Sequence, residues 1–179
     1  MKTRRVVVTG IGALTPIGNN LQEYWKSLKD GVSGASEITL FDATKFKTKF
    51  ACEVKGFDPL DYLDRKESRK MDRFTQLGMA SASQALKDST LDLEKSNLER
   101  FGVIWGSGIG GLKTFFDESV NFERNNQVPR FNPFFIPKMI SDIIAGHISI
   151  KYGFKGPNYT TVSACSSSSH AIIDSFNLI

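Results

Sequence analysis

The stretch TTVSACSSSSHA, residues 160–171, joins the end of one predicted element directly to the start of the next. Residues 158–162 are rich in β-branched side chains and predict a strand, whereas a helical pattern begins at Cys165. Because only two small residues separate the strand from the helix, the turn between them must be sharp. Cys165 is therefore expected at or near the N-terminus of a helix.

The rest of the chain alternates predicted strands with predicted helices. Further strands are predicted at residues 5–9 and 101–105, and helices at residues 21–28, 72–86 with Asp72 as the N-cap, 112–123, and 137 to about 153. Residues 29–63 and 131–137 show no sustained period and are expected to form irregular segments. This alternation favours a layered α/β fold with a mostly parallel sheet.

Composition limits the classes of protein to consider. A chain of 179 residues with 40% hydrophobic and 23% charged residues is long enough to bury a core and has ordinary globular usage. Cys52 and Cys165 fit no zinc-ligand spacing, so no metal site is expected, and a reducing cytoplasm is the natural compartment. No apolar run is long enough for a signal peptide or a membrane helix. The net charge of +4 permits an acidic partner without requiring nucleic acid or a membrane surface.

Gly106, Gly108 and Gly111 fit the pattern GxGxxG of dinucleotide-binding folds, after a predicted strand and before a predicted helix. Such a fold also needs a second strand that ends in an acidic residue roughly 20 positions further on. Residues 122–133 are polar and loop-like instead. The glycines are therefore expected to supply positive φ angles and close backbone approach at turns, not to bind a nucleotide.

A cysteine at a helix N-terminus is suited to nucleophilic chemistry. Unpaired N–H groups and the positive end of the helix dipole favour a thiolate, and the same N–H groups can face the oxyanion that forms when a thioester is attacked. The alternative is that Cys165 is simply a small buried hydrophobic residue. From the local sequence, Cys165 is compatible both with a nucleophile and with a small buried hydrophobic residue.

The segment TVSACSSSSHA resembles the active-site signature of the β-ketoacyl-carrier-protein synthases, in which the cysteine carries the acyl chain. Other segments are similar in the same order: RRVVVTGIGALTPIGN at 4–19, RKESRKMDRF at 65–74, GSGIGG at 106–111, NPFFIP at 132–137 and AGHISIKYGFKGPN at 145–158. The resemblance runs the whole length of the chain. It implies that residues 1–179 are the N-terminal portion of a ketosynthase with the thiolase-like αβαβα layered fold.

The resemblance also implies a mechanism. An acyl group passes from the phosphopantetheine of an acyl carrier protein to Cys165, and malonyl-carrier protein then loses CO₂ and attacks that thioester in a Claisen condensation. The phosphopantetheine arrives on the carrier, so no cofactor is expected on the chain itself. The histidines and the lysine that support decarboxylation in the family belong to motifs beyond Ile179. His147 is expected to be a satisfied core residue, and His170 to pack or hydrogen bond within the scaffold.

Residues for the acyl chain and for a second subunit follow from the same resemblance. Ile109 and Phe135 match positions that line the acyl channel in similar synthases, and Ala164 adjoins the nucleophile. Their alternative role is ordinary core packing. Phe134 resembles a residue near the family's dimer interface, which implies a homodimer.

A basic cluster is predicted to dock the carrier protein. Lys66, Arg69, Lys70 and Arg73 are spaced so that one continuous helix would place all four charges on one face. Acyl carrier proteins are acidic, so this face would steer them by charge complementarity. The alternative is an ordinary solvated surface.

Three other functions, within and outside the family, are compatible with parts of this sequence to different degrees. A chain-length partner of a true synthase typically lacks the nucleophilic cysteine, and Cys165 is present. A polyketide-type ketosynthase shares the condensation chemistry and stays open. If this chain stands alone, we expect it to be a non-catalytic portion that binds the carrier protein or forms a dimer.

Overall fold

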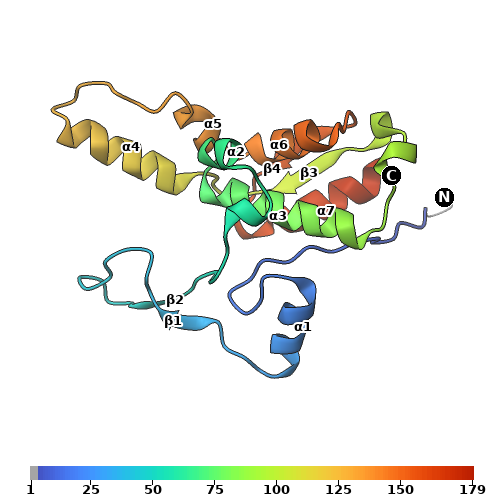
Figure 1. The fold of residues 1–179 in the computed structure, drawn as a ribbon, viewed down its shortest axis with the longest axis horizontal. Coiled ribbons are helices and arrows are strands. Elements are labelled where there is room, and N and C mark those ends of the chain that lie inside the picture. Colours follow the sequence, from blue (N-terminus) through green and yellow to red (C-terminus); the bar gives the residue numbers. More distant parts are fainter. Residues whose placement is uncertain (1–3) are drawn as a thin grey trace.

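A two-stranded parallel sheet lies at the centre of residues 4–179, the part of the chain that this computed structural model describes (Figure 1). Strand β3 (Val103–Gly106) pairs with β4 (Asn158–Thr161), so that Gly106 is opposite Thr161. Both strands were predicted, and the structure confirms them with boundaries shifted by one or two residues.

Helices cover the two faces of this sheet. Helices α3 (Arg73–Asp88) and α6 (Ile143–Tyr152) pack on the face that carries Val103 and Trp105. Helix α7 (Ser167–Leu178) packs on the other face, against Gly106. Val103 and Trp105 lie on one face and Gly106 on the other because successive residues of a strand point to opposite faces of the sheet.

The core lies where α3 meets α6. Met79 and Ile144 are fully buried there. Gly78 allows the close approach, since a Cβ at Gly78 would lie 2.8 Å from Ile144 Cδ1. Asp72 caps α3 as predicted, accepting a hydrogen bond of 3.2 Å from the Phe74 N–H.

The remaining elements surround this centre. They are α1 (Leu21–Lys29), the antiparallel hairpin of β1 (Ala35–Glu37) and β2 (Phe50–Cys52), α2 (Arg65–Arg69), α4 (Leu112–Arg124), α5 (Phe135–Met139), and the 3₁₀ turns η1 (Pro59–Asp61), η2 (Leu93–Lys95), η3 (Leu98–Arg100) and η4 (Ala164–Ser166). In Figure 1, α1 and the hairpin lie on one side of the body, and α4 extends away from it toward the left of the view. Among residues 4–179, none of the helices combines the length and the hydropathy that crossing a bilayer requires.

The strand predicted at residues 5–9 is wrong. These residues run as coil toward α3, and Val8 is 80% exposed. A strand needs a neighbouring strand for its backbone groups, and residues 4–179 provide none there. Side chains of α3 bind the following backbone instead: Gln84 accepts from the Ala13 N–H at 2.9 Å, and Asp88 accepts from the Ile11 N–H at 2.9 Å.

The single helix predicted from Pro137 to about Gly153 is also wrong, because it is divided in two. Helix α5 ends at Met139, Ile140 is extended, and α6 begins at Ile143. The Met139 carbonyl accepts instead from the Gly111 N–H of the GSGIGG loop at 2.9 Å. Helix α6 stops at Gly153 as predicted, with φ at +72°.

Candidate active site

The two parallel strands end at the same edge of the sheet, and the segments that follow them lie side by side. The Ser107 N–H donates to the Thr161 carbonyl at 3.2 Å, just past the last ladder pair. The GSGIGG loop follows β3, and the turn with Cys165 follows β4. This is the edge at which ligands bind in open α/β sheets.

Cys165 stands on a strained turn directly before α7. Ala164 has φ at +48°, a left-handed conformation that side-chain-bearing residues seldom adopt. The 3₁₀ turn η4 carries Cys165, and α7 starts immediately after it. The predicted sharp turn and helix-start position are confirmed. Cys165 is exposed in this chain, so the alternative of a buried hydrophobic cysteine is wrong here.

Ser167 holds this turn together. It is 3% exposed, and its hydroxyl accepts from the Ser163 N–H at 2.8 Å and donates to the Ala164 carbonyl at 2.7 Å. The Thr161 hydroxyl donates to the Ser167 carbonyl at 2.8 Å. Sequence reasoning missed Ser167. A signal existed in its spacing of four from Ala171, which puts both on the buried face of α7.

The backbone N–H of Cys165 is an unused donor. No group within residues 4–179 accepts a hydrogen bond from it. The residue itself is exposed.

The two histidines lie in different surroundings. His170 is exposed, and its Nδ1 lies 2.8 Å from the Ser163 hydroxyl, which confirms the predicted hydrogen-bonding role but not a packing one. The prediction that His147 is a satisfied core residue is wrong. It is half-buried, lines a hollow of about 330 Å³ with Glu67 and Lys151, and its ring makes no hydrogen bond within residues 4–179. Burial lowers the pKa of His147, because desolvation outweighs the opposing effect of Glu67.

The residues predicted to hold the acyl chain lie around the GSGIGG loop. Ile109 is 68% exposed and lines an apolar hollow of about 570 Å³ together with Phe115. Phe135 stacks on Phe115 with ring centroids 6.4 Å apart. Ala164 is exposed beside Cys165, and a Cβ added at Gly108 would lie 3.6 Å from the Ala164 carbonyl oxygen. Ile109 and Ala164 thus lie on adjoining loops. Phe135 lies beyond Phe115, on which its ring stacks.

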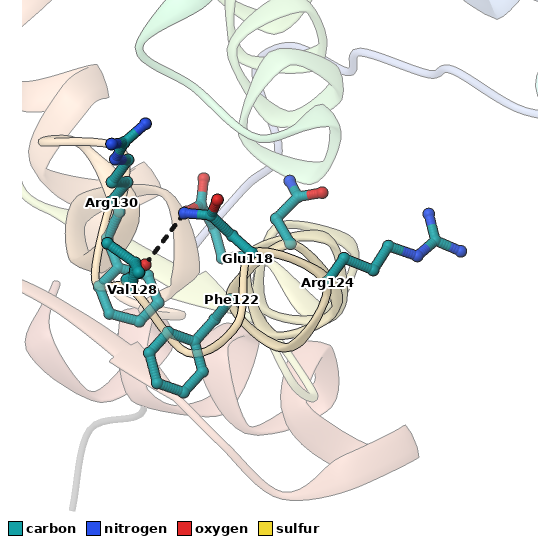
Figure 2. Close-up of a pocket in the computed structure, with 8 residues that line it drawn as sticks. Glu118, Phe122, Arg124, Val128 and Arg130 are labelled. Atoms are coloured by element: carbon teal, nitrogen blue, oxygen red, sulfur yellow. Dashed lines mark hydrogen bonds between the residues drawn. The ribbon is translucent and has the colours of Figure 1, made fainter.

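The aromatic stack continues away from this edge. Phe135 stacks on Phe131, and Phe131 on Phe122, with centroid distances of 5.5 and 5.4 Å. This row leads to another hollow of about 290 Å³ at the C-terminal end of α4, whose lining includes Phe122, Phe131 and Arg130 (Figure 2). Since the GSGIGG loop precedes the N-terminus of α4, this hollow lies roughly 20 Å of helix away from it.

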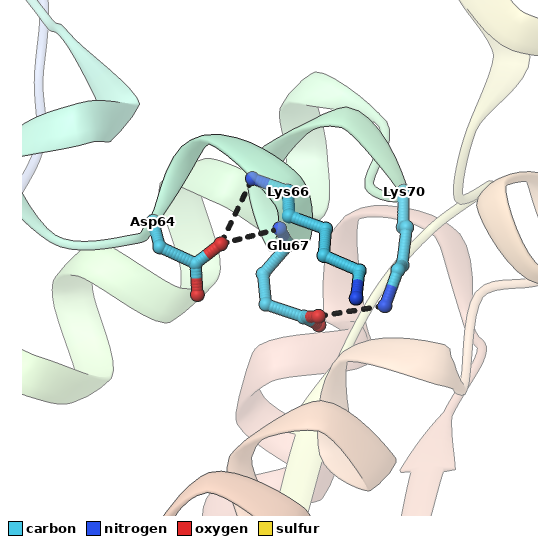
Figure 3. A network of polar contacts seen from close by, with 4 residues as sticks. All are labelled: Asp64, Lys66, Glu67 and Lys70. Carbon is cyan, nitrogen blue, oxygen red and sulfur yellow. Dashed lines mark hydrogen bonds and ion pairs between the residues drawn. The ribbon is translucent and has the colours of Figure 1, made fainter.

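The basic cluster is less regular than predicted. Helix α2 has only five residues, with Asp64 accepting from the Lys66 and Glu67 N–H groups (Figure 3). Lys66 and Arg69 are exposed, whereas Lys70 is paired with Glu67 at 2.6 Å. The expected continuous helix is wrong, since it breaks where Asp72 caps α3.

Arg73 accordingly leaves the predicted basic face. It begins α3 and lies over the Phe57 ring at 5.5 Å from the centroid. Its guanidinium also donates to the Val54 carbonyl at 3.4 Å. The basic surface therefore comprises the exposed Lys66 and Arg69 and the partly buried, partly neutralised Lys70.

Comparisons with known proteins agree with this geometry. Residues 3–179 match the model of the family "Beta-ketoacyl synthase, N-terminal domain". The chain is 44% identical over its whole length to 3-oxoacyl-[acyl-carrier-protein] synthase 2 of Synechocystis sp., and spans 43% of that relative. Its fold matches the ishigamide ketosynthase/chain length factor with a TM-score of 0.81, at 28% identity, over 90% of this chain and 40% of that one.

A second solved structure is a type II PKS acyl-carrier protein in complex with its ketosynthase bound to the hexaketide. Its match has a TM-score of 0.78 at 26% identity and covers 94% of this chain and 44% of that one. The chain thus spans less than half the length of the relatives that it matches. The fold is that of the corresponding part of thiolase-like ketosynthases, and the chain belongs to the β-ketoacyl synthase family, whose N-terminal domain it matches from residue 3 to residue 179.

Proposed function

We propose that the whole protein is a condensing acyltransferase of fatty-acid elongation, a 3-oxoacyl-carrier-protein synthase. The observation that carries the proposal is the exposed Cys165, which stands on a strained turn at the start of α7 in a chain of the β-ketoacyl synthase family. A chain-length partner without a nucleophile does not fit, because Cys165 is present and accessible.

The first step is acyl transfer. The Cys165 thiolate attacks the carbonyl carbon of an acyl thioester on the phosphopantetheine of the carrier, the new C–S bond forms, and the pantetheine thiolate leaves and takes up a proton. The free Cys165 N–H is a donor for the oxyanion of the tetrahedral intermediate. The chain's own contribution is thus the nucleophile and one oxyanion donor.

The second step is decarboxylative condensation. Malonyl-carrier protein releases CO₂, and the resulting enolate carbon attacks the Cys165 thioester to give 3-oxoacyl-carrier protein and the free thiol. We assign neither His147 nor His170 to this step, because His147 lines a hollow beside Glu67 and His170 is bound to Ser163. The groups that drive decarboxylation are proposed to lie in the part of the protein that its relatives have beyond the matched 43%.

The acyl chain is proposed to run over the apolar surface that includes Ile109 and Phe115, near Phe135. Burial of an alkyl chain there is favourable by about 0.8 kcal/mol per CH₂ group. Ala164, beside the nucleophile, is small enough to leave the thiol open to the thioester.

The carrier protein is proposed to dock on the basic surface of Lys66, Arg69 and Lys70, which would attract an acidic partner. The polyketide ketosynthase described above has an acyl-carrier protein as its partner, which supports the same kind of partner here. No cofactor is proposed on the chain itself. A homodimer with Phe134 near the interface, acting in the cytoplasm, completes the proposal.

A polyketide-type ketosynthase is the second candidate, supported by the likeness to the type II PKS ketosynthase described above, at 26% identity. The 44% identity to a fatty-acid-type synthase favours elongation. The test uses the full-length protein with acyl- and malonyl-carrier substrates, and mass spectrometry of the carrier. A single added two-carbon unit that is lost in Cys165→Ala and kept in Cys52→Ala is expected. Repeated extension without reduction would favour the polyketide reading, and no product would overturn the proposal.

A further inference from the structure

Ser167 differs from the other serines that follow Cys165. Ser166, Ser168 and Ser169 are exposed, whereas Ser167 is buried at 3% exposure. Its hydroxyl accepts from the Ser163 N–H at 2.8 Å and donates to the Ala164 carbonyl at 2.7 Å. The hydroxyl therefore bridges the residues on the N-terminal side of the nucleophile.

The Ala164 carbonyl and the Cys165 N–H belong to the same peptide unit. That unit is planar and trans, so the carbonyl and the N–H point in opposite directions. Ser167 holds the carbonyl twice, through its hydroxyl and through its backbone N–H. Holding the carbonyl in this way also fixes the direction of the Cys165 N–H, which has no acceptor within residues 4–179.

The backbone at this point needs such a restraint. Ala164 has φ at +48°, a conformation that alanine leaves readily when contacts do not hold it. Ser167 itself is fixed to the sheet edge, because the Thr161 hydroxyl donates to its carbonyl at 2.8 Å. The restraint therefore runs from β4 through Ser167 to the Ala164–Cys165 peptide.

We propose that Ser167 is a positioning residue: its hydroxyl holds the Ala164–Cys165 peptide so that the Cys165 N–H faces the oxygen of the attacked thioester. The proposal rests on the proposed function, since it concerns the acyl-transfer step. It assigns to Ser167 an effect on the oxyanion and not on the thiol, and the two can be separated by experiment.

The test compares two reactions of Cys165 in the full-length protein. Acyl transfer from a carrier thioester develops an oxyanion, whereas alkylation by iodoacetamide displaces iodide at a saturated carbon and develops none. In Ser167→Ala, the acylation rate is expected to fall about 10- to 100-fold, toward the loss seen when an oxyanion donor is removed. The alkylation rate of Cys165 is expected to change by less than about threefold, because the thiol keeps its place at the start of α7.

Matched variants isolate the hydroxyl. Ser167→Thr and Ser167→Val have nearly equal volume, and only the threonine keeps the donor and acceptor, so acylation should be faster in Ser167→Thr. Comparing these two variants also tests the role of the hydroxyl if Ser167→Ala does not fold. Ser169→Ala, at an exposed neighbouring serine, is the control and should leave both reactions unchanged.

Two outcomes would overturn the role of Ser167, and a third would refute the proposed function. Equal loss of acylation and alkylation in Ser167→Ala would make Ser167 a structural residue only, and unchanged acylation would remove it from the mechanism; either result overturns the proposal. An unsubstituted protein that is alkylated but takes no acyl group from the thioester would instead refute the proposed function itself, and this proposal with it.

Discussion

Gly106 lies so close to Ser168 that a Cβ on Gly106 would come within 2.5 Å of the Ser168 nitrogen. This contact sets the end of β3 against the first turn of α7. Cys165 immediately precedes that turn, so the absence of a side chain at residue 106 helps determine where the thiol stands.

Gly106→Ala is therefore expected to push α7 away from the sheet. The methyl group would meet backbone atoms of Ser167 and Ser168, which cannot rotate away as a side chain could. Overpacking of this kind costs about 1–3 kcal/mol. We expect a lower thermal midpoint of the full-length protein and slower acylation of Cys165. Gly146→Ala is the control, because within residues 4–179 nothing besides its own stretch of α6 lies within 4 Å of a Cβ there, and it should leave both quantities unchanged or raise stability slightly.

Cys165 is expected to react faster than Cys52, although both thiols are exposed. Cys52 ends strand β2, whereas Cys165 lies on the 3₁₀ turn immediately before α7, a position typical of reactive cysteines. Peptide mass spectrometry during alkylation with iodoacetamide at neutral pH measures both rates in one sample. We predict at least about a tenfold preference for Cys165. Equal rates would show that the helix start does not activate the thiol.

How far the sequence predicts this site depends on whether the contacts are local. The strand, the sharp turn and the helix around Cys165 follow from neighbouring residues, and all three are present. The strand predicted at residues 5–9 is absent because it lacks a pairing strand among the described residues. The continuous basic helix is absent because Asp72 interrupts it and accepts hydrogen bonds from the N–H groups of both Phe74 and Thr114. Ser167 was missed because its role depends on the direction of one peptide unit, which composition does not reveal.

Charge reversal at Lys66 and Arg69 tests the docking surface. In the full-length protein, the double change Lys66→Glu and Arg69→Glu should raise the KM for the acyl-carrier substrate about tenfold at low salt, less at high salt. It should leave the rate with an acyl-pantetheine donor unchanged. Lys26→Glu with Lys29→Glu is the matched control, since these exposed lysines have the same spacing on α1. Equal weakening of both donors would contradict docking at this surface.

His147 should make stability depend on pH. Burial holds the pKa of folded His147 below the ordinary value of 6.5, so below that pH the unfolded chain binds a proton that the folded chain resists. Stability from the neutral ring is therefore present above pH 6.5 and is lost as the pH falls toward the lowered pKa. Thermal unfolding at pH 8 and pH 5.5 should show the unsubstituted protein losing more than His147→Gln. Parallel losses in the two proteins would exclude this role for His147.

The most direct measurement is the intact mass of the protein after mixing with an acyl-carrier thioester, followed by peptide mapping. We predict one acyl group per chain, attached to Cys165, present in Cys52→Ala and absent in Cys165→Ala. An unmodified chain, or an acyl group that persists in Cys165→Ala, would contradict the role of Cys165 as the nucleophile.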